Sequence, residues 1–196
     1  MDIALATRNS KKAEELTRLF SGLGVRFLTL DEFPDCPEIV EDGKTFRANA
    51  LKKAVAVARF TGCLAVADDS GLEVDALGGA PGVFSARYAG IDADDKKNLR
   101  KLLKELNKFP GKSRGARFVC CIALALPDGH YKTFTGEARG TIGRRPEGEN
   151  GFGYDPVFYP EGRSMTFAEM SAVEKDSLSH RGKAMKKLYA YLKKSL

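Results

Sequence analysis

Apolar residues follow two kinds of spacing along the chain. Runs of adjacent or alternating apolar residues, which are typical of strands, occur at residues 2–6, 25–30, 63–67, 117–126, 131–139 and 157–159. Apolar residues three and four positions apart, as in an amphipathic helix, occur at Leu16, Leu19, Phe20 and Leu23, and further helices are predicted over residues 45–60, 92–107 and 179–194. Asp92 is expected to cap the helix over residues 92–107.

Strands and helices alternate in the first part of the chain, and a hairpin follows them. Pro127-Asp-Gly-His130 lies between two predicted strands and is a turn sequence typical of a β-hairpin. Alternation favours parallel strands, whereas the hairpin adds antiparallel ones, so we predict an α/β fold with a mixed β-sheet flanked by helices. No internal repeat or linker marks a boundary, and residues 1–196 are taken as one domain.

The composition narrows the class of protein. With 43% hydrophobic and 30% charged residues, the chain is able to bury a substantial core. No run approaches the roughly 20 apolar residues that span a bilayer, and the first residues lack a signal-peptide pattern, so we expect a soluble cytoplasmic protein. The four cysteines form no C-x-x-C pair and are expected to be buried thiols.

The net charge of +6 comes from the C-terminal end, because residues 175–196 contain seven Lys or Arg residues and one Asp. Such a segment suits nucleic acid, acidic lipid or a phosphorylated small molecule. It also fits a solvated helix face with no ligand.

Thr7-Arg8-Asn9-Ser10-Lys11-Lys12 follows the first predicted strand and begins a helix. In open α/β sheets, ligands bind beyond the carboxyl ends of strands. Small polar side chains, backbone N–H groups at a helix start and two lysines together provide an anion-binding loop. The same residues equally fit an ordinary helix cap with solvated lysines.

Asp68-Asp-Ser-Gly71 follows the apolar strand over residues 63–67, which is expected to end there. Adjacent residues of a strand point to opposite faces, so only one of Asp68 and Asp69 is expected to face a given ligand. Two carboxylates in a partly dry site favour a cation such as Mg²⁺, which takes few carboxylates together with water and phosphate oxygens. An Asx turn followed by glycine is the simpler interpretation.

Two further stretches combine donors and aromatic rings. Lys175, His180 and Arg181 surround a helix start and suit a phosphate or the oxygen of a purine base, whereas His130 in the hairpin is expected to be structural. Gly151-Phe-Gly-Tyr-Asp155 has two rings between glycines, as in a loop that stacks on a base, although such rings also pack locally.

Together these stretches resemble the inosine triphosphate pyrophosphatase family, whose members hydrolyse non-standard purine nucleoside triphosphates. The resemblance covers nearly the whole chain and rests on ALATRNSKKAEEL, VEDGKTFRANALKKA, ADDSGLEVDALGGAPGVFSARYAG, GFGYDPVF and SHRGKA, in the family's order. It implies hydrolysis of ITP, dITP and XTP to the monophosphate and pyrophosphate, with Mg²⁺. It also implies a homodimer whose chains each have two lobes with the active-site cleft between them.

The resemblance implies a role for each matching residue. Asp69 would be the general base and, together with Glu41, a ligand of Mg²⁺. The residues implied to hold the triphosphate are Thr7, Arg8, Asn9, Ser10, Lys11, Lys12, Lys53 and Ser70. Those implied to hold the base and sugar are Phe152, Gly153, Tyr154, Asp155, Lys175, His180 and Arg181. The family often has Gly where this chain has Arg8, which is expected to stiffen the loop and add a charge.

Two alternatives stay open at this point. One is a pyrophosphatase for another modified nucleotide, such as a modified pyrimidine. The other is a basic nucleic-acid-binding protein whose C-terminal helix contacts phosphates, which predicts oligonucleotide affinity that falls steeply with salt and does not need Asp69.

Overall fold

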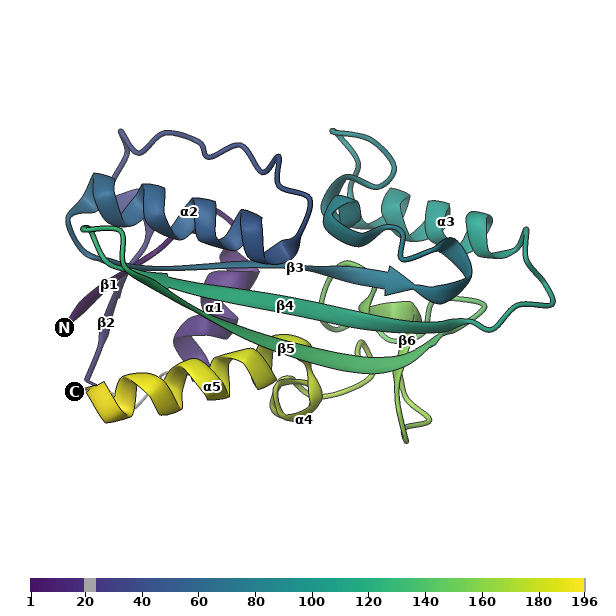
Figure 1. The fold of residues 1–196 in the computed structure, drawn as a ribbon. Coiled ribbons are helices and arrows are strands. Elements are labelled where there is room, and N and C mark those ends of the chain that lie inside the picture. Colours follow the sequence, from purple (N-terminus) through teal and green to yellow (C-terminus); the bar gives the residue numbers. More distant parts are fainter. Residues whose placement is uncertain (20–23, 196) are drawn as a thin grey trace. The chain divides into compact units, whose positions relative to one another are not determined.

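The computed structural model describes residues 1–19 and 24–195, so the predicted helix positions Phe20 and Leu23 lie outside the described residues. Its helices are α1 (Ser10–Leu19), α2 (Phe46–Thr61), α3 (Asp95–Leu106), α4 (Ala172–Leu178) and α5 (His180–Ser195). Its strands are β1 (Asp2–Leu5), β2 (Arg26–Leu28), β3 (Leu64–Val74), β4 (Gly115–Ala125), β5 (Tyr131–Ile142) and β6 (Phe158–Pro160) (Figure 1).

The strands form one mixed six-stranded sheet in the order β2-β1-β3-β4-β5-β6. β1 pairs in parallel with both β2 and β3, whereas β5 and β6 are antiparallel. The turn between β4 and β5 is closed by the Leu126 N–H, which donates to the His130 carbonyl at 2.8 Å. The predicted α/β class, mixed sheet and hairpin are therefore confirmed.

The chain divides into two compact units, and the long strands β3, β4 and β5 contribute residues to both. Unit 1 is drawn from residues 1–69, residues 120–136 and the described residues from Gly182 onward. Unit 2 comprises Ser70–Val119 and Glu137–Arg181.

In unit 1 the strands are covered by helices on both faces, with α2 on one face and α1 and α5 on the other (Figure 1). Alternate strand residues such as Ile3, Leu5 and Val66 pack against Leu16 of α1 and Leu188 of α5 in a buried cluster. The period of two along the strands and of three to four along the helices brings these apolar faces together. Unit 1 therefore holds its own core, and α1 and α5 are packed on it.

Unit 2 has a second core, rich in aromatic rings. Leu72 and Val74 of β3 and Leu102 of α3 belong to one buried cluster with Phe118, Phe158 and further apolar residues. The Phe118 and Phe158 rings meet edge to face with centroids 4.7 Å apart, a favoured arrangement of aromatic pairs.

The predicted end of β3 and the predicted cap of α3 were wrong. β3 does not end at Ala67 but runs on to Val74, so Asp68-Asp-Ser-Gly71 lies inside the strand and forms no Asx turn. Burial of Leu72 and Val74 against the unit 2 core extends the strand past the polar residues, an effect of tertiary packing that local sequence does not reveal. The cap of α3 is Asp94, whose side chain accepts from the Lys97 N–H at 2.7 Å, and Asp92 lies outside the helix.

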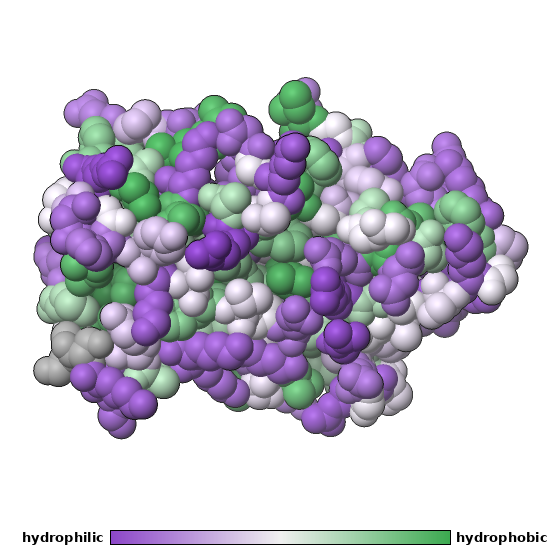
Figure 2. All heavy atoms as spheres, viewed as in Figure 1, coloured by the Kyte–Doolittle hydropathy of each residue, from purple (hydrophilic) through white to green (hydrophobic). Residues whose placement is uncertain are grey.

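Hydrophilic residues dominate the face of the molecule seen in Figure 2, where hydrophobic residues occur in small separate groups. Within the described residues, no helix is long and apolar enough to cross a membrane. Cys36, Cys120 and Cys121 are buried, as predicted, whereas Cys63 is only partly buried.

Candidate active site

The loop after β1 forms the start of α1 through its own side chains. The Thr7 hydroxyl accepts from the Asn9 N–H at 3.1 Å, and the Asn9 side-chain oxygen accepts from the Lys12 N–H at 3.2 Å. Asn9 is therefore the cap of α1, as N-caps accept from the third helical residue. Lys11 is exposed, and the side chain of Ser10 lies outside what the structure describes.

The Arg8 side chain is hydrogen-bonded to a segment outside this loop. Its Nη2 donates to the Cys36 carbonyl at 2.9 Å and so joins the loop to the segment that precedes Glu41. A hollow of about 550 Å³ lies beside it, lined by Thr7, Arg8, Asn9, Ala13, Glu14, Thr17, Arg18, Thr29, Leu30 and Asp31.

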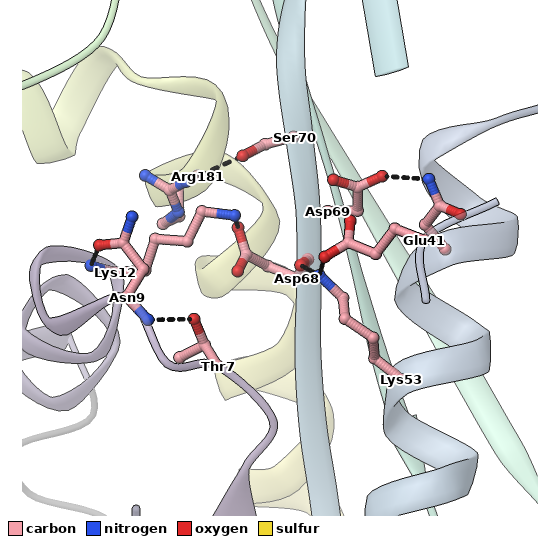
Figure 3. A network of polar contacts seen from close by, with 10 residues as sticks. Thr7, Asn9, Lys12, Glu41, Lys53, Asp68, Asp69, Ser70 and Arg181 are labelled. Carbon is pink, nitrogen blue, oxygen red and sulfur yellow. Dashed lines mark hydrogen bonds and ion pairs between the residues drawn. The ribbon is translucent and has the colours of Figure 1, made fainter. Parts of the chain in front are cut away.

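Asp68 and Asp69 point to opposite faces of β3, as strand alternation predicts (Figure 3). Asp68 forms an ion pair with Lys12 of α1, with 3.2 Å between Nζ and Oδ2. Asp69 instead accepts a hydrogen bond from the Asn49 amide of α2 at 3.0 Å. The Asp68 carboxylate thus lies on the face of β3 that meets α1, and the Asp69 carboxylate lies on the face that meets α2.

Asp69 is 7% exposed, and its carboxyl has a strongly shifted pKa. Burial raises its pKa to about 6, and the Glu41 carboxylate also raises it, while Lys53 and the Asn49 hydrogen bond act in the opposite direction. A buried carboxyl with a pKa near neutrality is typical of a general base.

Lys53 lies between the acidic groups. Its Nζ donates to Glu41 Oε1 at 2.9 Å and to the Asp68 carbonyl at 2.8 Å, and the residue is 9% exposed. Lys53 is therefore held between Glu41 and β3, beside Asp69 (Figure 3). The Glu41 carboxylate is close enough to Asp69 to raise the pKa of the Asp69 carboxyl.

Glu41 and Asp69 are the candidate ligands for a metal ion at this site. Among residues 1–19 and 24–195, no three His, Cys, Asp or Glu side chains gather closely enough to hold an ion by themselves. Glu41 and Asp69 provide two hard oxygen donors, and Mg²⁺ commonly uses one or two carboxylates with water and substrate phosphates completing its shell. The residues present therefore fit a magnesium ion that arrives with a polyphosphate, and do not form an all-protein cage.

In unit 2, Asp155 organises the glycine-rich loop. Its Oδ2 accepts from the Phe152 N–H at 2.9 Å and from the Lys175 Nζ at 2.8 Å, and Asp155 and Lys175 are 3% and 6% exposed. Gly151 has a φ of +74°, and a Cβ there would lie 2.2 Å from Asp155 Oδ2, so only glycine fits this turn.

Two residues of the same loop are tied to the rest of unit 2. The Gly153 N–H donates to Asp95 at 2.8 Å. Tyr154 is buried in the core, and its hydroxyl donates to the Ser85 carbonyl at 2.8 Å. Burial raises the pKa of the Tyr154 hydroxyl, which stays protonated as the donor of that bond. Tyr154 therefore anchors the loop and does not face solvent.

Arg181 is among the largest fully buried side chains of the described residues and lies beside the Phe152 ring. Its Nη2 donates to the Ser70 hydroxyl at 2.9 Å, and its guanidinium carbon is 5.5 Å from the Phe152 centroid. The Lys175 ammonium is 4.6 Å from the same centroid, within the range of a cation–π contact. The His180 ring stacks on Phe118 at 4.6 Å. The sequence-predicted residues Ser70, Phe152, Asp155, Lys175, His180 and Arg181 are thus gathered in unit 2.

A sequence model of the Ham1 family matches residues 3–191. This chain belongs to the Ham1 family. A Streptomyces avermitilis protein named dITP/XTP pyrophosphatase is 50% identical over 196 residues, which cover 99% of this chain and 98% of that one. A protein of the same name from Desulforamulus reducens is 53% identical, with 95% and 93% of the two chains covered.

Solved structures of Ham1 proteins share the fold. The HAM1 protein of Coxiella burnetii superimposes with a TM-score of 0.92 at 42% identity, with 99% of each chain covered. The nucleoside-triphosphatase, or dITP/XTP pyrophosphatase, of Mycobacterium abscessus gives a TM-score of 0.79 at 46% identity over 96% of this chain and 98% of that one. The six-stranded sheet flanked by helices is therefore the Ham1 architecture.

Sequence reasoning missed several residues that contact the candidate site residues. Asn49 stands four positions before Lys53 on the same face of α2, a helical spacing that was visible in the sequence. Asp95, which binds Gly153, and Phe118, which stacks on His180, gave no local signal because their partners are distant in sequence.

Proposed function

We propose that this chain hydrolyses the non-standard purine nucleoside triphosphates ITP, dITP and XTP to the monophosphate and pyrophosphate. The observation that carries the proposal is Asp69, a nearly buried carboxyl with a pKa of about 6 beside Lys53 and Glu41. It lies in a chain about half identical to proteins named dITP/XTP pyrophosphatase.

The triphosphate would bind at the start of α1. The N-terminal N–H groups and the positive end of the helix dipole favour anions there. Thr7, Asn9, Ser10 and Lys11 border this position, and Lys12 adds a cation that already pairs with Asp68. Lys53 and Ser70 complete the proposed set of phosphate contacts, while Arg8 acts on the loop through Cys36.

Hydrolysis requires a water oxygen to bond to the α-phosphorus while the bond to the β-phosphate oxygen breaks. Asp69 would accept the proton of that water. Without a metal, burial raises the pKa of the Asp69 carboxyl to about 6, and a bound cation would lower this pKa and keep the carboxylate ionised at neutral pH, ready to accept the proton. Glu41 and Asp69 would hold Mg²⁺, which when bound neutralises charge on the phosphate oxygens.

The base and sugar would be held by the residues gathered in unit 2. Phe152 offers a ring for stacking, and Asp155, Gly153 and Tyr154 fix the loop that carries it. Donors from Lys175, His180 and Arg181 would favour the six-position carbonyl of hypoxanthine and xanthine. An adenine amino group would leave a buried donor without an acceptor, at a cost of about 1–3 kcal/mol.

The test is a pyrophosphate-release assay over ITP, dITP, XTP, GTP, ATP and a modified pyrimidine triphosphate, with and without Mg²⁺. We expect the inosine and xanthosine substrates to be preferred and Asp69→Asn to be inactive while folded. Equal rates with ITP and ATP would contradict the proposed discrimination, and preference for the pyrimidine would favour the other pyrophosphatase.

The nucleic-acid-binding alternative is disfavoured by burial. Lys175 and Arg181, two of the seven cations in the basic C-terminal segment, are 6% and 2% exposed, so only the other five are available at the surface for phosphates. As part of the same proposal, we expect a homodimer that acts in the cytoplasm, which sedimentation of the purified chain and cell fractionation would test.

A further inference from the structure

Asn49 is a buried amide on the face of α2 that meets β3. It is 0% exposed and stands one helical turn before Lys53, whose Nζ bonds the backbone of that strand at Asp68. Asn49 bonds the next residue of the strand, Asp69, so the two side chains of α2 contact adjacent strand positions. An amide in this position has a cost of burial that only its hydrogen bonds offset.

The two hydrogen bonds of Asn49 fix its orientation. The Gly43 N–H donates to Asn49 Oδ1 at 2.7 Å, and Asn49 Nδ2 donates to Asp69 Oδ2 at 3.0 Å. A backbone N–H can only donate, so the oxygen of the amide must face Gly43 and the nitrogen must face Asp69. The same amide therefore holds the carboxylate with a donor and the loop before α2 with an acceptor.

Gly43 is needed for this close approach. A Cβ at position 43 would lie 2.5 Å from Asn49 Oδ1 and 3.0 Å from the Ala48 Cβ, nearer than such atoms pack. The φ of Gly43 is not positive, so the absence of a side chain, and not an unusual backbone conformation, explains the glycine here.

The loop held in this way carries Glu41. We call residues 37–43 the Glu41 loop; Glu41 lies two residues before Gly43 and is itself bonded to Lys53 at 2.9 Å. An exposed ion pair between Asp42 and Lys52 also contacts α2, but exposed pairs contribute little. Asn49 is thus a buried link between the Glu41 loop and the Asp69 carboxylate, beside the one that Lys53 makes to the strand backbone.

We propose that Asn49 is a positioning residue that sets Asp69 and the Glu41 loop in one arrangement before metal and nucleotide bind. The inference rests on the proposed function, because it assigns Asn49 to the two carboxylates proposed to hold Mg²⁺. Its consequence is that loss of Asn49 lowers turnover and loosens the Glu41 loop together.

The chain offers a matched control in Asn98 of α3. Asn98 is 2% exposed, and its amide likewise makes two hydrogen bonds, accepting from the Ala89 N–H at 2.7 Å and donating to the Ala86 carbonyl at 3.0 Å. Asn49→Ala and Asn98→Ala therefore remove the same group from equally buried settings, and only the first of these touches Asp69.

The experiment compares the full-length variants by ITP turnover, by the Mg²⁺ concentration for half-maximal rate and by amide hydrogen exchange of residues 37–43 without nucleotide. For Asn49→Ala we expect kcat to fall about 10²-fold with KM for ITP within about threefold, since a small displacement of reacting groups has this effect. The Mg²⁺ requirement should rise and exchange in the Glu41 loop should accelerate. Asn98→Ala should keep kcat within about twofold and leave that exchange unchanged.

Asn49→Asp distinguishes the hydrogen bond to Gly43 from the hydrogen bond to Asp69. It also provides the test if Asn49→Ala does not fold. It keeps an acceptor for Gly43 but replaces the donor to Asp69 by a second carboxylate, so the loop should stay protected while turnover falls. The inference is overturned if Asn49→Ala matches Asn98→Ala in kcat and loop exchange, or if Asn49→Asp retains wild-type turnover. A wild-type chain that releases no pyrophosphate from any substrate would instead overturn the proposed function, and the exchange measurement would still test the link.

Discussion

Asp69 of unit 1 and Asp155 of unit 2 are both buried carboxyls, but their negative charges are compensated differently. In unit 2 the buried carboxylate of Asp155 meets a buried ammonium, Lys175, and a backbone N–H, so its charge is matched within the protein. In unit 1 burial raises the pKa of Asp69 to about 6 despite Lys53 and Asn49, and Glu41 adds to the effect. The surroundings of Asp69 thus hold its ionised form less well than water does.

The difference indicates separate tasks. A buried carboxylate with its hydrogen bonds satisfied, such as Asp155, is held rigidly and suits a site that recognises an uncharged base by shape and hydrogen bonds. A buried carboxylate beside a second one is costly without a cation, and such costs gather at catalytic centres. The surroundings of Asp69 are thus suited to an added positive charge, whereas Asp155 already has one in Lys175.

The largest effect is expected from Asp69→Asn, which removes the buried carboxylate of unit 1. We expect kcat for ITP to fall about 10⁴-fold, the upper end of what a general base contributes, because the same group is also proposed to hold the metal. The measurement is pyrophosphate release at saturating Mg²⁺. Turnover within tenfold of wild type would show that another group accepts the proton.

The next effect breaks the pairing in unit 2 by Asp155→Ala. This change removes the carboxylate that Lys175 and the Phe152 N–H bind, and breaking a buried pair costs about 3–5 kcal/mol. Urea unfolding should show the loss. Replacing both partners, with Asp155→Leu and Lys175→Met, should cost less than the single change; a double variant at least as unstable as Asp155→Ala would mean that the pair is not the source of the effect.

The sequence predicted unit 1 better than unit 2. The start of α1 depends on Thr7, Asn9 and Lys12, which lie within six residues, so local capping rules were sufficient. The extension of β3 depends instead on the packing of Leu72 and Val74 in a core built from residues far along the chain. Local patterns contain no information about such partners.

The same contrast applies to the candidate site. Strand alternation predicted that Asp68 and Asp69 would part, and the structure confirms it. It could not predict that Tyr154 would point into the core towards Ser85, because that bond joins residues 69 positions apart. The roles of the site residues remain predictions, and their positions are what the structure contributes.

A smaller effect concerns stability and sharpens the contrast at Asp69. Its pKa is about 6 in the folded chain and 3.8 for an aspartate in water, so between these pH values the native protein binds more protons than the unfolded one. Stability without metal should therefore fall as the pH rises from about 4 to 6 and then level off. The difference between these two pKa values lowers the free energy of unfolding by about 3 kcal/mol at neutral pH, relative to low pH.

Asp69→Asn should remove that fall and make the metal-free chain more stable at pH 7. Thermal or urea unfolding in EDTA across pH 4–8 measures it. Asp68→Asn is the matched control: its side chain is 0% exposed but paired with Lys12, so removing its charge should not stabilise the protein. Equal gains from both variants would mean that burial of Asp69 is not the cause.

The smallest effect concerns Arg8, a cation of unit 1 that is already bound within the protein. Because its guanidinium donates to the Cys36 carbonyl, Arg8→Gly should cost about 1 kcal/mol of stability, the contribution of one hydrogen bond. We expect KM for ITP to rise less than about threefold, whereas Lys12→Gln, at the helix start, should raise it more. Steady-state kinetics of both variants decide the matter. A different result would be that Arg8→Gly raises KM as much as Lys12→Gln does, and that Arg8→Lys restores the wild-type KM. The Arg8 charge would then act on the triphosphate directly, and unit 1 would present one more cation to its ligand than the hydrogen bond to Cys36 implies.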